Sequence, residues 1–534
     1  MISQFSLVLC VIDLDRIHGV FLGQQMNNKL SLDNRNSRMI DLTILFIILI
    51  GFYLRVSNVF DQVPWDGEDF MAGRILESKT IVIDGAFPGV SKPLWQLFVA
   101  LGYQIMGFRL FVGSLLSVMF GTAIIALVYK CCTILVNKNS GVVGAVLVSS
   151  MLTFIHFSRL PQAPMASLFC MLLGICLYLY IDRNRNVDLK WMILVGFVMG
   201  FTIVLHSIYF IPAFLTVIVW ELINEYSYAR KLQVRILRFI GRSFVLLASM
   251  LLPILIAEII VRVCRSYGLS ASSWLGGAYL QMFDPFPDPS SFSDFFSYIV
   301  VFVQTDGMFI AILFVLSLIF AIQQFVVTKS MIWLKIVAFF VIPFMLLELS
   351  IFTKGLALKK YYVIFMIGVP IMIGCCISIV FDRVRLFRRL NLSFQLAQWF
   401  LIVILLGSNY LRARPRIQWT SGVDTTFVAI QALEAENLYY ATDLGDFYFD
   451  HQSNAYKLTE ELSQSILPSN NNLVAITVEG SCDCFKNDDV CQSELITLQH
   501  FDEEMLKMLH AVQGYGPDLF GSLKPNWCHV LYLY

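Results

Sequence analysis

Leu110–Tyr129 reads LFVGSLLSVMFGTAIIALVY, a run of 20 residues that contains no charged side chain. A helix needs about 20 predominantly apolar residues to cross the hydrocarbon core of a bilayer. The whole chain has a similar character, because 57% of its residues are apolar and 14% are charged, against roughly 45–50% and about 25% in soluble domains. The sequence therefore predicts a polytopic α-helical membrane protein. The 38 basic residues balance 38 acidic ones, which gives no sign of nucleic-acid binding, and the apolar content excludes a disordered chain.

Ten further stretches are long and apolar enough, or nearly so, to be predicted as spans. The long run Trp191–Leu222 is divided at His206 and Ser207, because this polar pair and Pro212 interrupt it. The other predicted spans are Met39–Phe60, Gly141–Phe157, Ala163–Ile181, Trp191–Leu205, Ile208–Leu222, Phe244–Val261, Tyr298–Ile322, Met331–Ile351, Tyr361–Phe381 and Phe394–Tyr410.

Lys and Arg gather in every second connection between the predicted spans. Short basic loops favour the cytoplasmic side of a membrane, so we expect these loops and the N-terminus to face the cytoplasm. Everything after Tyr410 is then expected outside. The basic residues are Arg35, Arg38, Lys130, Lys138, Arg183, Arg185, Lys190, Arg230, Lys231, Arg235, Arg238, Arg242, Lys329, Lys335, Arg383, Arg385, Arg388 and Arg389.

Two segments need a separate interpretation. Pro93–Phe108 is apolar but short, and a full crossing would break the alternation of basic loops. We predict a juxtamembrane or half-embedded helix on the outer side. An ordinary short span is the alternative, and the chain then has about 11–12 spans in total.

Residues 1–38 contain only the short apolar run Phe5–Ile12, with no basic segment before it. They are predicted to be a poorly ordered cytoplasmic leader rather than a signal peptide.

The predicted outer loops contain charges of both signs, with three acids within four positions of the first loop and bases in later ones. A carboxylate can deprotonate an acceptor hydroxyl or amine, and Lys or Arg can hold a departing phosphate. Charges in loops can also serve only to solvate them, and residue types alone fit an enzyme and a transporter equally well. The acids are Asp66, Glu68 and Asp69, and the bases are Arg159, Lys359 and Lys360.

The order of three motifs is informative. After the first predicted span come DGEDFMAGRILES (Asp66–Ser78), SKPLWQLFVALGYQIMGF (Ser91–Phe108) and FSRLPQAPMASLF (Phe157–Phe169). This order resembles the GT-C membrane glycosyltransferases, in particular the family-39-like group of protein mannosyltransferases and the lipid A aminoarabinose transferase. The resemblance implies a GT-C-like transmembrane domain that takes a sugar from a polyprenyl-phosphate carrier and inverts the anomeric centre.

The resemblance also implies roles for particular residues. Asp66 or Asp69 corresponds to the acid of the first loop and would act as the base, with Glu68 between them in the catalytic cluster. Cations would bind the donor phosphate. Those cations are Arg74, Lys92, Arg159, Lys359 and Lys360.

The chain departs from the family pattern at two places. Relatives such as the lipid A enzyme have Asp-Pro-Met where this chain has Ala163, Pro164 and Met165. The missing acid puts any metal site built on it in doubt, so a divalent metal cofactor is possible but unsupported. His206 falls near a position that is often Lys, and a single His at a helix end is more often structural than catalytic, although it can titrate near neutral pH.

Residues 411–534 are predicted to form a small extracytoplasmic α/β accessory domain after the last span. Runs of β-branched and aromatic residues predict strands at Phe427–Leu433, Asn437–Thr442, Asn472–Val478 and His529–Tyr534, and helices are expected at Glu460–Ile466 and Asp502–Val512. An even number of Cys in an outer domain favours two disulfides, with three pairings possible and a zinc site as the alternative. These residues are Cys482, Cys484, Cys491 and Cys528.

The sequence therefore predicts a leader (1–38), a GT-C-like catalytic domain (39–410) and an accessory domain (411–534). The expected partners are the bilayer, a polyprenyl-phosphate sugar and a lipid, glycan or protein acceptor. No nucleotide sugar is expected, because the catalytic loops face away from the cytoplasm. A bacterial plasma membrane is favoured over the endoplasmic reticulum, by analogy, because the chain has no large inserted outer loop. The alternatives are a non-catalytic relative and a polytopic lipid or polysaccharide transporter.

Overall fold

The computed structural model describes residues 30–61, 78–83, 92–109, 111–183, 189–227, 232–267, 273–276, 297–354, 362–383 and 394–418. It also describes five strands between residues 437 and 533. Every helix, strand and contact described below involves only these residues. Residues 1–29 of the predicted leader lie outside them, whereas residues 30–38, predicted to be poorly ordered, form the start of the helix Leu30–Val56.

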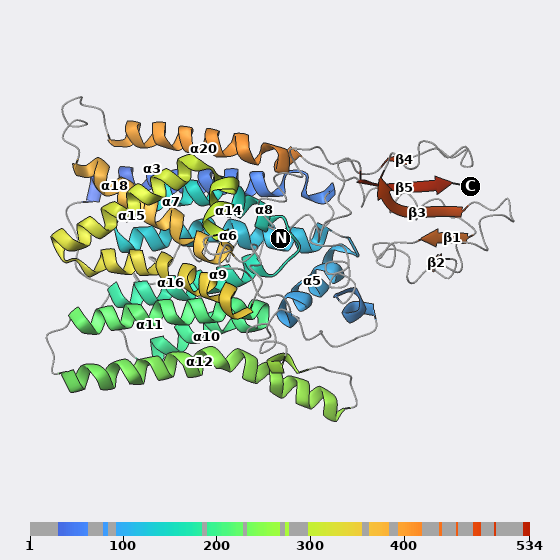
Figure 1. Cartoon of the computed structure of the whole chain (residues 1–534), viewed down its shortest axis with the longest axis horizontal. Helices are drawn as coiled ribbons and strands as arrows, with labels where there is room; N and C mark the ends of the chain where they lie inside the picture. The colour runs from blue at the N-terminus through green and yellow to red at the C-terminus, as the bar shows by residue number, and fades with distance from the viewer. Residues whose placement is uncertain are drawn as a thin grey trace.

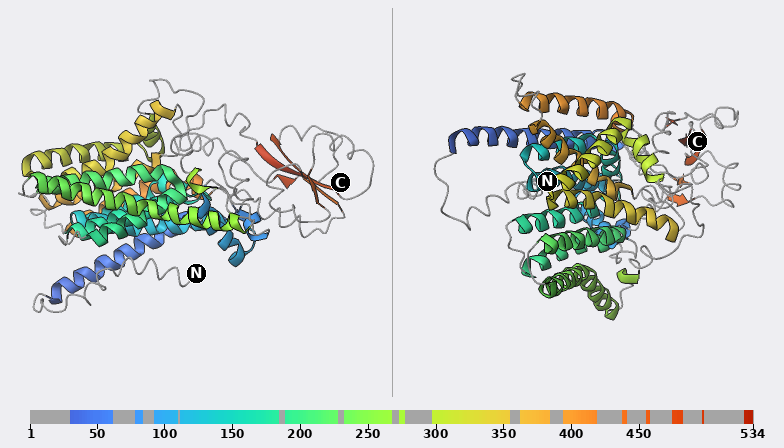
Figure 2. Two further views of the ribbon diagram at one scale, coloured as in Figure 1. Left: turned by 90° about the horizontal axis from the view of Figure 1, so that it is seen from below. Right: turned by 60° about the vertical axis from the view of Figure 1, so that its left-hand side comes forward.

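The helices form a bundle and run side by side (Figure 1 and Figure 2). Each predicted span coincides with a helix or with two consecutive helices. Seven helical stretches of the described chain are long and apolar enough to cross a membrane, or up to eight if the bent pair α7 and α8 forms one span. The bounds are α3 (Leu30–Val56), α5 (Pro93–Met106), α6 (Phe111–Leu135), α7 (Lys138–Ser150), α8 (Leu152–Ser158), α9 (Pro164–Arg183), α10 (Leu189–His206), α11 (Phe210–Ser227), α12 (Leu232–Ser266), α14 (Ser297–Asp306), α15 (Met308–Thr328), α16 (Met331–Lys354), α17 (Val363–Met366), α18 (Gly368–Arg383) and α20 (Phe394–Gln418).

The predicted division at His206 coincides with a break between α10 and α11. His206 has φ −161° and ψ 97°, and a short 3-10 turn follows it, so the α-helix ends there. Asn224, near the end of α11, donates to Asp182 near the end of α9 at 2.8 Å. Since α10 begins shortly after α9 ends, α11 ends at the level where α10 begins. The two helices therefore run in opposite directions within the continuous apolar stretch Leu189–Tyr226.

The prediction of one uninterrupted span at Tyr298–Ile322 is wrong. The helix breaks at Gly307, whose φ of +91° lies in a region that residues with a Cβ rarely adopt. A Cβ at this position would also collide with the guanidinium of Arg412. The apolar span is α15, Met308–Thr328, and α14 is a separate ten-residue helix that lies outside it.

Contacts between helix ends define the two ends of the bundle. At one end Ser378, near the end of α18, donates to the Asn137 side chain at 3.0 Å. The helices that precede the predicted basic loops end on this side, so we call it the basic-loop end. The other end carries α5 (Figure 1), and we call it the α5 end. The 14 residues of α5 extend about 21 Å at 1.5 Å per residue, which is too short to cross a hydrocarbon core of about 30 Å.

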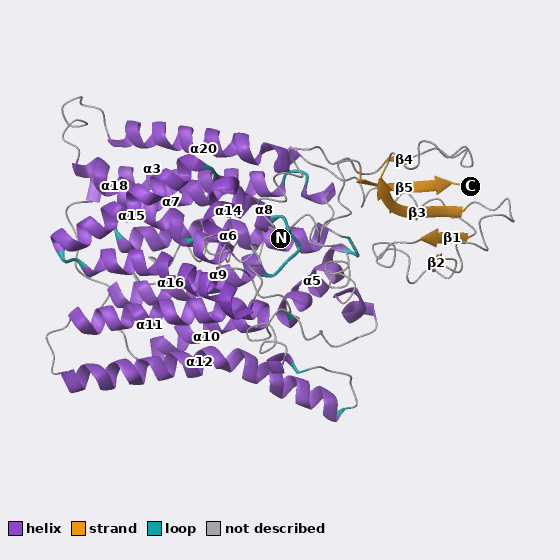
Figure 3. Ribbon diagram, viewed as in Figure 1, coloured by secondary structure: helices purple, strands orange, loops and turns teal. Residues whose placement is uncertain are grey.

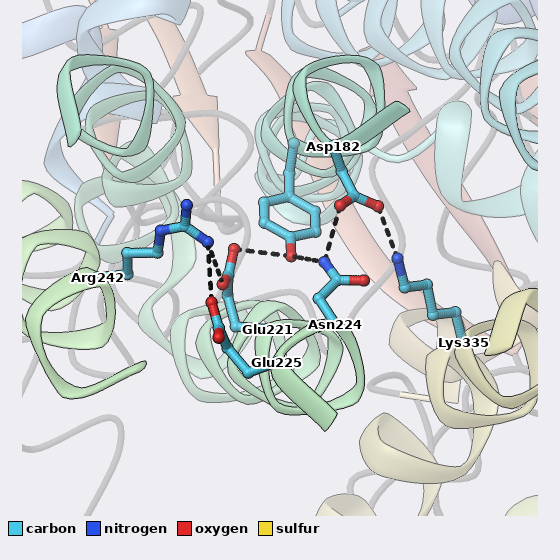
Figure 4. A network of polar contacts seen from close by, with 7 residues as sticks. Asp182, Glu221, Asn224, Glu225, Arg242 and Lys335 are labelled. Carbon is cyan, nitrogen blue, oxygen red and sulfur yellow. Dashed lines mark hydrogen bonds and ion pairs between the residues drawn. The ribbon is translucent and has the colours of Figure 1, made fainter. Parts of the chain in front are cut away.

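A polar network joins four helices at the basic-loop end (Figure 4). Lys335 of α16 pairs with Asp182 of α9 at 2.6 Å. Asn224 of α11 donates to both Asp182, at 2.8 Å, and the Tyr178 hydroxyl, at 2.9 Å. These side chains therefore connect α9 to α11 and α16 where the apolar surface ends.

The same network continues to α12 through two buried carboxylates. The Tyr178 hydroxyl donates to Glu221 at 2.9 Å. Arg242 lies 3.1 Å from Glu221 and 3.5 Å from Glu225. Buried carboxylates need such partners, because removing a charge from water without compensation is costly. Arg242, one of the predicted cytoplasmic cations, is thus an internal ion-pair partner.

Replacing Lys335 by Met is expected to lower the free energy of unfolding by about 1–2 kcal/mol, because Asp182 would lose its cation in a mostly buried site. Thermal unfolding of the purified chain in detergent measures this loss. Lys329→Met is the matched control, since Lys329 is an exposed residue at the end of α15. Equal melting temperatures for the two variants would contradict the role of the ion pair.

The region after α20 contains five strands in one mixed sheet (Figure 3). Strand order is β2-β1-β3-β5-β4, with β1 parallel to β2 and β3, and β5 antiparallel to β3 and β4. Three of the strands, β1, β3 and β5, overlap predicted strands. The fourth predicted strand and both predicted helices lie outside the described residues, which contain no helix after Gln418, so they do not support the α/β assignment. The bounds are β1 (Asn437–Tyr440), β2 (Ala455–Lys457), β3 (Val474–Ser481), β4 (Ile496–Thr497) and β5 (Trp527–Leu533).

Candidate active site at the α5 end of the bundle

A broken helix dominates the α5 end of the bundle. Helices α7 and α8 meet at Met151 with a bend of 59°. The last carbonyls of a helix and the first amides of the next have no partner within their own helix. A break inside a packed bundle therefore needs hydrogen-bonding groups from elsewhere in the chain.

Arg55 of α3 supplies the donors for the end of α7. Its guanidinium donates to the carbonyl oxygens of Val148 at 2.7 Å and Ser149 at 3.0 Å. Further bonds reach the Gly51 carbonyl at 2.8 Å and the Ser158 hydroxyl at 3.1 Å. The side chain is fully buried. A cation at the carboxyl end of a helix also interacts favourably with the helix dipole.

Asp306 of α14 supplies the acceptor for the start of α8. Its carboxylate accepts from the Thr153 amide at 3.1 Å and from the Thr153 hydroxyl. The Thr153 Oγ1 atom in turn lies 2.7 Å from the Tyr362 hydroxyl. Burial raises the pKa of the Asp306 carboxyl to about 6, although its hydrogen bonds with Thr153 and the charge of Arg412 oppose the shift.

Arg159, one of the predicted phosphate-binding residues, lies directly after α8. Its guanidinium donates to the carbonyls of Leu54 at 3.2 Å and Ser57 at 2.6 Å, at the end of α3. The side chain is buried. Arg159 thus fixes the end of α8 against the end of α3.

The loop after Arg159 joins this region to α5 and α6. Trp95 of α5 donates from its indole nitrogen to the Pro161 carbonyl at 3.2 Å, and Ser117 of α6 donates to the Gln162 carbonyl at 3.0 Å. Trp95 lies three residues after Lys92, and Pro161 lies two residues after Arg159. The structure therefore brings the segments of Lys92 and Arg159, two predicted phosphate-binding residues, to the same end of the bundle.

Lys92 itself has an unusual backbone. It precedes α5 in the left-handed conformation, with φ 59° and ψ 51°, and its side chain is only 7% exposed. The left-handed conformation costs a residue with a Cβ about 1–2 kcal/mol. Such strained residues gather at functional sites, which is consistent with the predicted role of Lys92.

His206 and Ala163 lie at the same end. His206 is buried at the break after α10, with its ring 5.6 Å from that of Tyr209. Leu94 of α5 packs against the apolar cluster that includes Ile203 and Val204 of α10. Ala163 is fully buried and precedes Pro164, the first residue of α9. The methyl group of Ala163 cannot bind a metal. Among the described residues there is also no cluster of three metal-binding side chains.

The other predicted site residues lie outside the described residues. They are the catalytic acids and nearby base Asp66, Glu68, Asp69 and Arg74, the late cations Lys359 and Lys360, and three of the tail cysteines, Cys482, Cys484 and Cys491. Cys528 lies in β5, opposite Gly480 of β3. Their predicted roles, and the disulfides, stay predictions.

Sequence reasoning missed the two charges that hold the broken helix. Arg55 lies within the predicted first span and Asp306 within the predicted span Tyr298–Ile322. A charged residue inside an apolar span is by default a candidate for a specific internal role. That signal was therefore available in the sequence for both residues.

Comparisons with known proteins identify a matching sequence family and similar folds. The sequence model of the dolichyl-phosphate-mannose-protein mannosyltransferase family matches residues 90–256, which contain α5, the Arg159 loop and the break at His206. No curated protein sequence matches the chain significantly.

The folds of many solved structures are similar to that of this chain, and two of them illustrate the likeness. ArnT from Cupriavidus metallidurans, solved with undecaprenyl phosphate, has a TM-score of 0.55 at 12% identity, covering 93% of this chain and 98% of ArnT. The Archaeoglobus fulgidus oligosaccharyltransferase, in the apo form, has a TM-score of 0.50 at 10% identity over 73% of this chain. The chain spans 57% of the length of that oligosaccharyltransferase.

The chain is therefore an integral membrane protein with a fold similar to that of ArnT. The resemblance predicted from its motifs, to the group of protein mannosyltransferases and the aminoarabinose transferase, is confirmed.

Proposed function

We propose that the chain is a membrane glycosyltransferase that moves a sugar from a polyprenyl-phosphate donor to a lipid, glycan or protein acceptor. The observation that carries this proposal is the meeting of the Lys92 and Arg159 segments at one end of a GT-C fold. The similar protein ArnT was solved with undecaprenyl phosphate, a ligand of the proposed chemical class.

The proposed reaction is a direct displacement that inverts the anomeric centre. Asp66 or Asp69, in the loop they share with Glu68, removes the proton of the acceptor as it attacks. The oxygen of the polyprenyl phosphate leaves with the bonding electrons. Arg74, Lys92, Arg159, Lys359 and Lys360 hold its negative charge. Stabilising charge that develops on a leaving group is a large contribution to catalysis.

The proposed orientation places the α5 end outside and the basic-loop end in the cytoplasm. The hydrophobic donor would then enter from the bilayer, and the region after Gln418 would lie on the catalytic side and select the acceptor. A bacterial plasma membrane is the proposed location, with the endoplasmic reticulum as the alternative.

Transfer of a radiolabelled sugar from a panel of polyprenyl-phosphate sugars, in membranes that contain the chain, tests the proposal. Activity with at least one donor supports it. A folded chain that transfers no sugar from any donor of the panel contradicts it and favours a non-catalytic relative. The specific observation behind that second candidate is Ala163, which stands where relatives have an acid.

Replacing Lys92 by Gly is expected to have opposite effects on donor binding and stability. Loss of the ammonium should raise the KM for the donor about tenfold, because one charge-assisted contact to the phosphate is lost. Glycine adopts positive φ without strain, so the free energy of unfolding should rise by up to about 1 kcal/mol. Donor kinetics and thermal unfolding measure the two effects.

Lys92→Ala is the matched control, because it removes the ammonium and keeps the backbone strain. Its KM should match that of the glycine variant, while its stability should not increase. An unchanged KM in both variants would exclude Lys92 from the phosphate site.

A further inference from the structure

We propose that Asp306 is a positioning residue that joins two chain segments and thereby holds Arg159 of the donor-phosphate site in place. This inference rests on the proposed function. One segment is α8, which leads into Arg159 at its end. The other begins at Tyr362, directly before α17. The side chain of Asp306 contacts Thr153 at the start of α8, so its effect on donor binding would act through the backbone segments that it holds.

The contacts form a directed chain of hydrogen bonds. A threonine hydroxyl has one hydrogen to donate, and that of Thr153 is given to the Asp306 carboxylate. The Tyr362 hydroxyl must then donate to Thr153 Oγ1, 2.7 Å away. The carboxylate also accepts from the Thr153 amide at 3.1 Å. One carboxylate therefore fixes both the start of α8 and the start of the segment at Tyr362.

Aromatic packing reinforces the same junction. The Phe157 ring of α8 lies 5.8 Å from the Tyr362 ring in an edge-to-face arrangement, and Tyr362 is itself fully buried. Edge-to-face pairs at this distance are stabilising. Phe157 lies two residues before Arg159, so the position of Tyr362 is transmitted to the residue that would contact the phosphate.

The negative charge of Asp306 sets the direction of these hydrogen bonds, because an ionised carboxylate can only accept. It is faced by the Thr153 and Tyr362 hydroxyls and by the positive charge of Arg412 from α20. A protonated carboxyl must itself donate a hydrogen, and the Thr153 amide and hydroxyl then compete for weaker acceptors. Since burial raises the pKa of this carboxyl to about 6, the junction should loosen as the pH falls through that value.

The test is the affinity for undecaprenyl phosphate of the full chain in nanodiscs, measured side by side for wild type and Asp306→Asn from pH 5 to pH 8. The neutral amide mimics the protonated carboxyl and does not titrate. At pH 8 the variant is expected to bind about tenfold more weakly, because small displacements of a site cost such factors. At pH 5 the two affinities should converge. The second ionisation of the ligand, near pH 6, affects both proteins equally and cancels in their ratio.

Glu258→Gln is the matched control. Glu258 of α12 also accepts from one hydroxyl and one amide, those of Ser273 at 2.9 Å and Leu275 at 2.6 Å, and it has no contact with α8 or Tyr362 in the described chain. Its affinity ratio to wild type should stay near one at every pH. Thr153→Val provides a second variant, and it should weaken binding at pH 8 even if Asp306→Asn does not fold.

The outcomes separate this inference from the proposed function. If wild type and both variants at Asp306 and Thr153 bind undecaprenyl phosphate equally at pH 8, the positioning role is wrong and the proposed function stands. If Asp306→Asn is weaker by the same factor at every pH, the ionised carboxylate is not the cause, and the inference is again wrong. If the wild-type chain does not bind undecaprenyl phosphate, the proposed function itself fails, and this inference fails with it.

Discussion

Changing the base of the first loop to its amide is expected to lower the rate of sugar transfer by about 10²–10⁴-fold, the usual contribution of a general base. Asp66→Asn and Asp69→Asn are the two variants. One of them should lose this factor in kcat, because an amide cannot accept the proton of the attacking hydroxyl or amine. The other should retain most of the activity. Transfer of radiolabelled sugar from the best donor measures both.

Asp84→Asn is the matched control, since Asp84 lies in the same predicted outer segment of the sequence and has no predicted role. Its activity should equal that of wild type at equal amounts of protein in the membrane. Glu68→Gln tests the acid between the two candidates. If neither Asp66→Asn nor Asp69→Asn lowers the rate while the wild-type chain is active, the base lies elsewhere.

The positions of the helices could be predicted because membrane spans depend on local composition. A stretch such as Leu110–Tyr129 has no charged side chain and is long enough to cross, so its helix, α6, follows from the sequence without knowledge of any neighbour. The break at His206 was also predictable, since two adjacent polar residues and Pro212 interrupt an apolar run. Local signals thus give the element order of the bundle.

The break at Met151 could not be predicted in this way. Met151 follows the polar pair Ser149 and Ser150 and precedes Leu152. Serine hydroxyls can bond back to a carbonyl of their own helix, as both do here with Val146, so such a pair does not by itself distinguish a broken helix from a continuous one. It is stable because Arg55 and Asp306, about 100 and 150 positions away, satisfy the freed backbone groups. The two charges are visible in the sequence, but their common target is not.

The sequence motifs suggested which residues belong to the candidate site, but they indicated only partly which of these residues lie close together. The motifs placed Lys92 and Arg159 in the same function, and the bond from Trp95 to the Pro161 carbonyl shows that their segments meet. The backbone contacts of Arg159 were not foreseen, because a surface-loop arginine and a buried one that caps α3 look the same in sequence. Three-dimensional packing decides between them.

Replacing Arg55 by Met is expected to cause the largest loss of stability, about 3–5 kcal/mol. The fully buried guanidinium makes bonds to the Val148 and Ser149 carbonyls and to the Ser158 hydroxyl. Methionine has a similar length and no donors, so these acceptors would stay buried without partners, at a cost of about 1–3 kcal/mol each when nothing compensates. Thermal unfolding in detergent, followed by the loss of monodisperse protein, measures the change.

The matched control for this prediction is Arg262→Met, because Arg262 lies on the exposed surface of α12. Its melting temperature should stay close to that of wild type, since exposed charges contribute little. If Arg55→Met does not accumulate in the membrane, Arg55→Lys serves as the second variant. A lysine ammonium can donate to one or two of the acceptors. Unlike the planar guanidinium, it cannot reach both the carbonyls of α7 and the Ser158 hydroxyl at once. Arg55→Lys should therefore melt between Arg262→Met and Arg55→Met. A lysine variant as stable as wild type would mean that the broken helix needs only a positive charge, and that the geometry of the guanidinium is not what holds α7 and α8 together.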